Sequence, residues 1–201
     1  MTSVVAIINN ALNIIGASNI TDLGENSKTA RVMNQMYENV RDDVFRAHPW
    51  NCLIRRANLA QSVDTPVFDY AYQYALPTDP YCLRLLEFQN GSMTYPYENL
   101  VGQGNKPFIV VEGRNLLTDS GTARIKYIAR ITDPTQYDAG LVSVLAARLA
   151  SEAAYTITGS TSVVQIADAL YERKLREARF SDATENGTMK LEASDFIEAR
   201  F

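Results

Sequence analysis

A pair of amphipathic helical segments between residues 133 and 180 constrains the fold of this chain more than any other feature. After an Asp-Pro start, an alanine-rich apolar run extends from Gly140 to Ile157, and a Gly159-Ser160 break separates it from a second run. Small side chains allow another helix to approach closely. The second run repeats apolar residues every three or four positions, and a polar segment follows it from Asp182. Both segments must therefore bury a face against other helices.

The first 48 residues contain the other strong helical patterns. Thr2 or Ser3 can cap a first helix, and Gly16 is placed to end it. Ser27 can cap a longer helix, which should end at His48 because a proline follows. We therefore predict a helical unit built from both ends of the chain, with a different domain inserted between them.

The segment from Trp50 to Ile131 is predicted to form β-strands, because its apolar period shortens from about 3.6 residues to about 2. Its clearest strand spans residues 68–76, where Tyr70, Tyr72 and Tyr74 project to one side. We interpret these tyrosines as packing into the core of the inserted domain. Further strands are expected at residues 82–88, 108–111, 115–118 and 123–131.

The predicted fold class is α+β: a helical bundle of about four helices from both chain ends, with an inserted antiparallel β-sandwich or barrel-like domain. Residues 1–48 and 133–190 would form the discontinuous helical bundle domain, 49–132 the inserted β domain and 191–201 a C-terminal docking arm. The longest apolar runs fall well short of a membrane span, so we expect no membrane anchor. The first residues lack a basic leader and a cleavage signal, so we expect no secretory peptide.

The titratable residues give little support to catalysis. His48 is the only histidine, and its place beside a proline at a predicted helix end is more typical of a capping or packed residue than of a general base. Cys52 and Cys82 are too few for a disulfide framework or a four-ligand zinc site, and we interpret both as small core residues. We expect no enzyme activity, catalytic residue, metal or cofactor. A hydrolase that uses His48 with nearby acids is the alternative left open.

The charge balance argues against tight binding of nucleic acid. The chain carries 19 Lys and Arg against 23 Asp and Glu, whereas tight phosphate binding needs clustered cations. Weak contact with DNA is still compatible with the sequence. The candidate residues are Arg55-Arg56, and Arg124, Lys126 and Arg130, which alternate along one side of a predicted strand. A β-domain nucleic-acid-binding protein that stacks bases on the tyrosine strand is a second alternative.

A series of short motifs follows the chain in a fixed order. They are Arg46-Ala-His48-Pro49-Trp50-Asn51, then Leu76-Pro77-Thr78-Asp79 and Cys82-Leu83-Arg84-Leu85-Leu86, then Tyr127-Ile128-Ala129-Arg130 and Asp133-Pro134, then Leu145-Ala146-Ala147-Arg148-Leu149-Ala150. In this order and spacing they resemble the tail tubular protein A family, the head-to-tail adaptors of short-tailed bacteriophages. The resemblance covers essentially the whole chain.

The resemblance implies a structural virion protein whose helical bundle is interrupted by a β domain. Such adaptors form a dodecameric ring beneath the portal protein, extend its DNA channel for genome retention and ejection, and offer a platform for the tail nozzle protein and often for tail fibres. It thus implies a homo-oligomer that lets genomic DNA pass without sequence-specific binding. Its location would be the tail connector of the virion, after assembly in the host bacterial cytoplasm. Another connector layer, a head-completion or stopper protein, is the nearest alternative.

A ring subunit needs two unlike lateral faces, because cyclic assembly uses heterologous contacts. The charged faces of the second and last predicted helices are our candidates for these contacts. The lateral ring contacts are predicted at Arg31, Glu38, Arg41, Glu172, Arg173 and Arg176. The portal-docking arm is predicted at Phe196, Ile197, Arg200 and Phe201.

Overall fold

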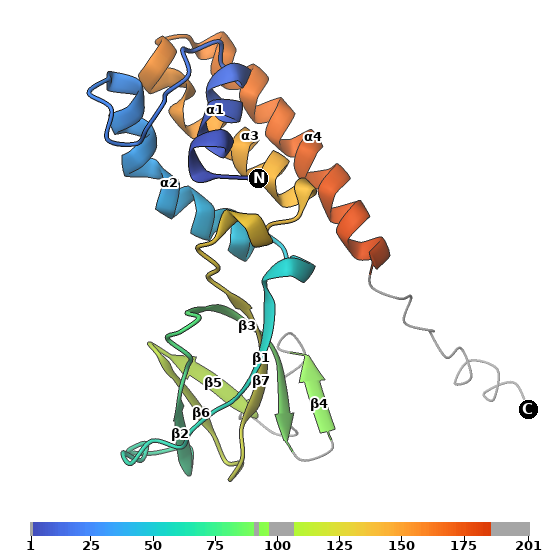
Figure 1. Ribbon diagram of the computed structural model, residues 1–201. Helices are drawn as coiled ribbons and strands as arrows, with labels where there is room; N and C mark the ends of the chain where they lie inside the picture. The colour runs from blue at the N-terminus through green and yellow to red at the C-terminus, as the bar shows by residue number, and fades with distance from the viewer. Residues whose placement is uncertain (1, 91–92, 97–106, 186–201) are drawn as a thin grey trace, which may run out of the picture.

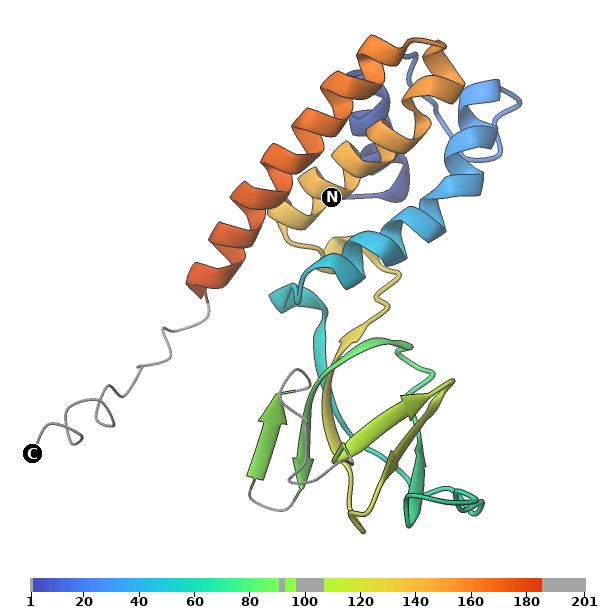
Figure 2. The same cartoon turned by 180° about the vertical axis from the view of Figure 1, so that it is seen from behind.

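The protein has a mixed α+β fold in which helices gather at one end and strands at the other (Figures 1 and 2). The computed structural model describes residues 2–90, 93–96 and 107–185. The helices come from both ends of the described chain and the strands lie between them in sequence, as predicted. The helical elements are α1 (Val4–Ile14), α2 (Lys28–Ala47), α3 (Ala139–Thr158) and α4 (Thr161–Glu185), with short 3₁₀ helices η1 (Asn51–Leu53) and η3 (Pro134–Gln136).

The helix ends follow from local capping. The Ser3 hydroxyl accepts a hydrogen bond from the backbone N–H of the third residue of α1, and Ser27 does the same for α2, each at 3.1 Å. Gly159 ends α3 in the left-handed conformation, with φ of 69°. These predicted helix boundaries are confirmed. The exception is α4, which continues to Glu185, so that Asp182 belongs to the helix and not to a polar segment after it.

Helix α3 is the centre of the helical part, and it packs against α1, α2 and α4. Its alanines allow this close packing, because Ala146, Ala150, Ala153 and Ala154 are all buried. Gly140 marks a close approach of α3 to α4, since a Cβ placed there would lie 3.2 Å from the Cβ of Ala178 in α4. The prediction that the small residues allow another helix to approach closely is therefore confirmed.

The strands form two separate antiparallel sheets, and within the described residues they do not close into one barrel. A four-stranded sheet has the order β1-β7-β3-β4, and a three-stranded sheet has the order β2-β6-β5. The two-residue turn between β5 and β6 places Gly113 at φ of 58°, a conformation that glycine adopts without strain. The strands are β1 (Ile54–Asn58), β2 (Tyr72–Ala75), β3 (Cys82–Asn90), β4 (Met93–Pro96), β5 (Ile109–Glu112), β6 (Asn115–Thr118) and β7 (Arg124–Ala129).

The predicted tyrosine strand is shorter than expected. Only Tyr72–Ala75 is a strand, because Asp69 has a φ of 67° and interrupts the extended backbone. Phe68 lies before this interruption and is 75% exposed. Tyr74 is buried as predicted, and its hydroxyl donates to the Ser120 carbonyl at 2.9 Å. The prediction that all the aromatic residues of 68–76 share one buried face is therefore wrong, whereas the core role of Tyr74 is confirmed.

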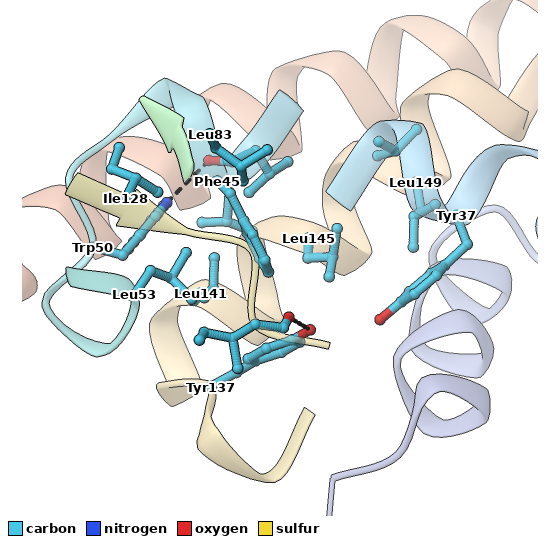
Figure 3. Packing of buried hydrophobic residues seen from close by; sticks show 14 of the residues in the cluster. Tyr37, Phe45, Trp50, Leu53, Leu83, Ile128, Tyr137, Leu141, Leu145 and Leu149 are labelled. Carbon is cyan, nitrogen blue, oxygen red and sulfur yellow. Dashed lines mark hydrogen bonds between the residues drawn. The ribbon is translucent and has the colours of Figure 1, made fainter. Parts of the chain in front are cut away.

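The hydrophobic core continues from the helical part into the sheets (Figure 3). Trp50 is fully buried at the junction, and its indole N–H donates to the Val44 carbonyl at 3.0 Å. Leu53, Ile128 and Leu141 lie in the same cluster and come from η1, β7 and α3. A shared core of this kind holds the two parts in a fixed relation.

Candidate functional site

The outer side of α4 presents a row of exposed residues, which we call the α4 stripe. It consists of Ser162, Ile166, Ala169, Arg173, Arg176 and Phe180, all exposed and spaced by three or four residues. Ile166 is 65% exposed and Phe180 75%, although large apolar side chains are usually buried. Arg173 lies 4.0 Å from Glu177, a surface pair that contributes little stability. The stripe thus combines apolar ends with a basic middle.

A second surface lies along α2, where a groove of about 500 Å³ opens beside α1. Val4, Leu23 and Tyr37 provide apolar surface within it, and the exposed Glu38 places a carboxylate at its side. We call this the α2 groove. Helices α2 and α4 form the two edges of the helical part, with α1 and α3 between them (Figures 1 and 2). The groove and the stripe therefore belong to different edges of one subunit.

Five of the six predicted lateral residues are exposed in these regions. Arg31 and Glu38 lie on α2, and Glu172 lies beside Arg173 and Arg176 on α4. The structure separates them into two groups and does not join them into one site. The predicted docking residues Phe196, Ile197, Arg200 and Phe201 lie outside the described residues.

Arg41 is a correction to the predicted lateral set. It is only 5% exposed, because helical periodicity places it on the inward side of α2 with Tyr37 and Val44. Its charge is balanced by Asp42 at 2.9 Å, and the other carboxylate oxygen of Asp42 lies 2.5 Å from Arg130. A buried cation needs such a partner. Arg41 therefore stabilises the subunit, and the small part of it that is exposed lies in the lining of the α2 groove.

A hydrogen-bonded junction joins the ends of α2 and α4 beneath these surfaces. His48 Nε2 lies 2.9 Å from one carboxylate oxygen of Asp182, and the backbone N–H of Asn51 donates to the other at 3.0 Å. The Asn51 side-chain amide donates to the Asp182 carbonyl at 2.8 Å. Arg179 adds a hydrogen bond to the Ala47 carbonyl at 2.8 Å. These contacts fix the start of the β part against the last helix.

Asp182 is the junction residue that could not be identified from the sequence. The spacing of Asp182 indicates that it is buried, because it follows Leu175 and Ala178 at the three- and four-residue intervals of the buried face of α4. A carboxylate at an apolar position indicates a buried hydrogen-bonding partner, but the partners lie more than 130 positions away. His48 was predicted as a capping or packed residue, and it is the C-cap of α2 as well as a partner of Asp182.

The two thiols lack the environment of an activated nucleophile. Burial raises the pKa of the Cys52 thiol, and it raises the pKa of Cys82 to about 11, partly opposed by Arg114. A reactive cysteine needs a lowered pKa. Both side chains pack against the hydrophobic core, as predicted. In the described part of the chain, no group of three or more His, Cys, Asp or Glu residues is placed to hold a metal ion.

The basic residues of the β part do not form one continuous face. Arg55 turns back to the backbone carbonyls of Cys52 and Ile54, at 3.0 and 2.8 Å. Arg130 forms an ion pair with Asp42 of α2, and its guanidinium lies over the ring of Tyr81. Arg56 and Arg124 remain exposed on the four-stranded sheet.

Comparison of the sequence with protein-family models and with curated proteins finds no match. Among the helices of the described residues, none combines the length and the apolar composition needed to cross a membrane.

Proposed function

We propose that this protein is a head-to-tail adaptor of a short-tailed bacteriophage, and that it assembles as a ring between the portal protein and the tail nozzle protein. The observation that carries this proposal is the pair of unlike surfaces on the two edges of the helical part. A closed ring uses heterologous contacts, in which one face of each subunit meets a different face of the next. The α4 stripe and the α2 groove provide two such faces.

The two surfaces are also complementary in chemistry. The α4 stripe offers Ile166 and Phe180 with Arg173 and Arg176 between them. The lining of the α2 groove offers apolar surface and the Glu38 carboxylate, and the charge of Arg41, which also lines it, is balanced by Asp42. Exposed apolar residues next to charges are typical of protein interfaces, in which the charges select the partner. In the proposed ring, the α4 stripe of one copy packs against the α2 groove of the next.

The resemblance to the tail tubular protein A family supports the remaining parts of the proposal. The helical part would be a four-helix bundle formed by residues 1–48 and 133–190, and the two sheets of 49–132 would pack as a sandwich. The ring, a dodecamer in this family, would extend the DNA channel and offer a platform for the nozzle and for tail fibres. The protein would then be a structural component of the virion and not an enzyme.

Residues 191–201 would act as a docking arm on the portal protein. Their sequence combines aromatic and apolar residues with charges of both signs, which suits an interface. Binding of the purified chain to its portal protein, measured by co-sedimentation, tests the proposal. We expect the full chain to bind and a chain ending at Lys190 to lose binding while keeping its helical circular dichroism. A full chain that never sediments with the portal would contradict the adaptor function, whereas equal binding by the shortened chain would contradict only the docking arm.

A further inference from the structure

A polar groove of about 430 Å³ lies on the exposed face of the four-stranded sheet. Its side chains stand in two rows across neighbouring strands. In the first row Arg56 on β1 pairs in register with Lys126 on β7, which pairs with Glu87 on β3. In the second row Asn58 stands opposite Arg124, followed by Gln89 and Thr94. Residues at alternate positions point to the same side of a strand, so both rows face one groove.

The groove carries a local positive charge on an acidic protein. Lys126 is neutralised by Glu87, with 2.8 Å between Nζ and Oε1. Arg56 and Arg124 are exposed and make neither an ion pair nor a side-chain hydrogen bond with the part of the chain that the structure describes. Three cations and one carboxylate leave a net charge of about two in the groove, whereas the chain as a whole has a formal charge of −4. The lining of the groove is therefore net positive, whereas the chain as a whole is net negative.

We propose that this groove binds the phosphodiester backbone of nucleic acid without reading its sequence. Phosphate oxygens in protein complexes are contacted by Arg and Lys together with Asn, Gln and Thr, and these residue types make up the two rows apart from Glu87, which is paired with Lys126. An arginine guanidinium can donate two parallel hydrogen bonds to one phosphate. No aromatic residue lines the groove among the described residues. The described lining therefore offers phosphate contacts and no aromatic ring for the bases to stack on, so we assign the contact to the backbone.

The geometry favours a nucleic acid over an acidic peptide. Residues two positions apart on a strand are separated by about 7 Å, so the two rows present donors repeatedly along the strand direction. A nucleic acid carries a charge on every nucleotide and can meet such rows in any register. An acidic peptide would need carboxylates at one particular spacing. The site goes beyond the adaptor function and does not depend on ring formation.

The expected binding is weak and sensitive to salt. Arg56 and Arg124 have no ion pair within the described residues, so the logarithm of the association constant for a single strand should fall with the logarithm of salt concentration with a slope of about −1.4. Such a contact suits transient interaction, because each neutralised phosphate adds only a modest electrostatic contribution. Several copies on one strand would bind more tightly than a single chain.

Nuclear magnetic resonance at low salt tests the site directly. The full chain, labelled with ¹⁵N, is titrated with a short single-stranded oligonucleotide and, separately, with a poly-glutamate peptide at equal charge concentration. We expect the oligonucleotide to shift the backbone amides of Arg56, Asn58, Arg124 and Lys126 first, and poly-glutamate to shift them much less. Shifts confined to other regions, or equal shifts with both polymers, would overturn the proposal.

A charge-matched pair of variants completes the test. The R56E/R124E protein should bind the oligonucleotide at least about tenfold more weakly, because two charge-assisted contacts become repulsive. The control K28E/K174E carries the same change in net charge on helical positions outside the groove, the α4 stripe and the predicted lateral contacts, and it should bind like the original protein. R56Q/R124Q provides a milder second variant should the glutamates disturb folding. Equal affinity of the R56E/R124E or R56Q/R124Q protein and the control would contradict the site.

Discussion

His48 Nε2 and Asp182 Oδ2 lie 2.9 Å apart, although 134 sequence positions separate the two residues. The contact joins the end of α2 to the last turns of α4, and Asp182 also accepts the backbone N–H of Asn51 at 3.0 Å. Because Asn51 begins the short helix that leads into β1, one carboxylate connects the helical part to the β part. We infer that this junction sets the orientation of the sheets beneath the helices.

Replacing Asp182 with alanine should destabilise the fold by about 2 to 4 kcal/mol. The change removes a buried carboxylate and leaves His48 and the Asn51 N–H without a partner in a site where Asp182 is only 6% exposed. Urea unfolding followed by circular dichroism measures the loss. Glu177→Ala is the matched control, because it removes an exposed carboxylate from the same helix and should change stability by less than about 0.5 kcal/mol. Equal effects of the two changes would contradict the role of the junction.

Gly140→Val should destabilise the packing of α3 against α4. A Cβ at this position would lie 3.2 Å from the Ala178 Cβ and 2.9 Å from an Asp138 side-chain oxygen, so the larger side chain forces the two helices apart. The expected cost is about 1 to 3 kcal/mol, typical of overpacking. Thermal unfolding provides the measurement, and Ala139→Val at the exposed neighbouring position is the control. A Gly140→Val protein as stable as this control would show that the close approach of α3 and α4 at Gly140 does not contribute to the stability of the fold.

Stability should fall in alkaline solution, and Cys82 should account for part of the fall. Burial raises the pKa of its thiol from 9.0 to about 11, so the folded state keeps a proton that the unfolded state loses. The stability linked to this group is complete below pH 9 and is lost as the pH rises through about 11. The loss from Cys82 alone is at most about 3 kcal/mol.

The contribution of Cys82 can be separated from that of the tyrosines. Burial also raises the pKa values of Tyr37, Tyr137 and Tyr171, which act in the same direction. Urea unfolding of the original protein and of Cys82→Ala across this pH range isolates the thiol, because only the original protein contains it. The variant should lose less stability than the original protein between the two ends of the range. If the stability of both proteins fell equally with pH, the Cys82 thiol would have the same pKa in the folded and the unfolded state, which would contradict the prediction.

Local features allowed most of the helical part to be predicted from the sequence. Ser27 and Gly159 act through hydrogen bonds and backbone angles within a few residues, so their effect can be read directly. Strand β1 was missed, because its sequence Ile-Arg-Arg-Ala-Asn has few apolar residues and becomes a strand by pairing with the distant β7. Strand β4 was missed as well, since it is a four-residue strand at the edge of its sheet.

The candidate surfaces were only partly predictable for a related reason. Arg41 and Asp182 carry charges but occupy inward positions. The cost of burying each charge is offset by a partner: the adjoining Asp42 for Arg41, and the distant His48 for Asp182. Their charge led us to assign both to solvent, although their spacing places them among the buried residues of α2 and α4. The exposed residues Arg173 and Arg176 were identified because no apolar repeat includes them. The groove of Arg56 and Arg124 needed the register of β1 and β7, which the sequence does not supply.

A charge exchange tests the proposed contact between neighbouring subunits. Arg176→Glu on the α4 stripe or Glu38→Lys beside the α2 groove should each prevent assembly, because each places like charges together at the proposed interface. The double variant restores opposite charges and should assemble again. Both residues are exposed, so the folded subunit should keep its stability in all three variants.

Electron microscopy of the protein mixed with its portal protein measures the central claim most directly. We predict a second ring, coaxial with the portal, for the original protein and for the double variant, and a bare portal for each single variant. A bare portal with the original protein as well, at concentrations far above those of the portal subunits, would contradict the adaptor function. Coaxial rings with all four proteins would retain that function but contradict the pairing of the α4 stripe with the α2 groove.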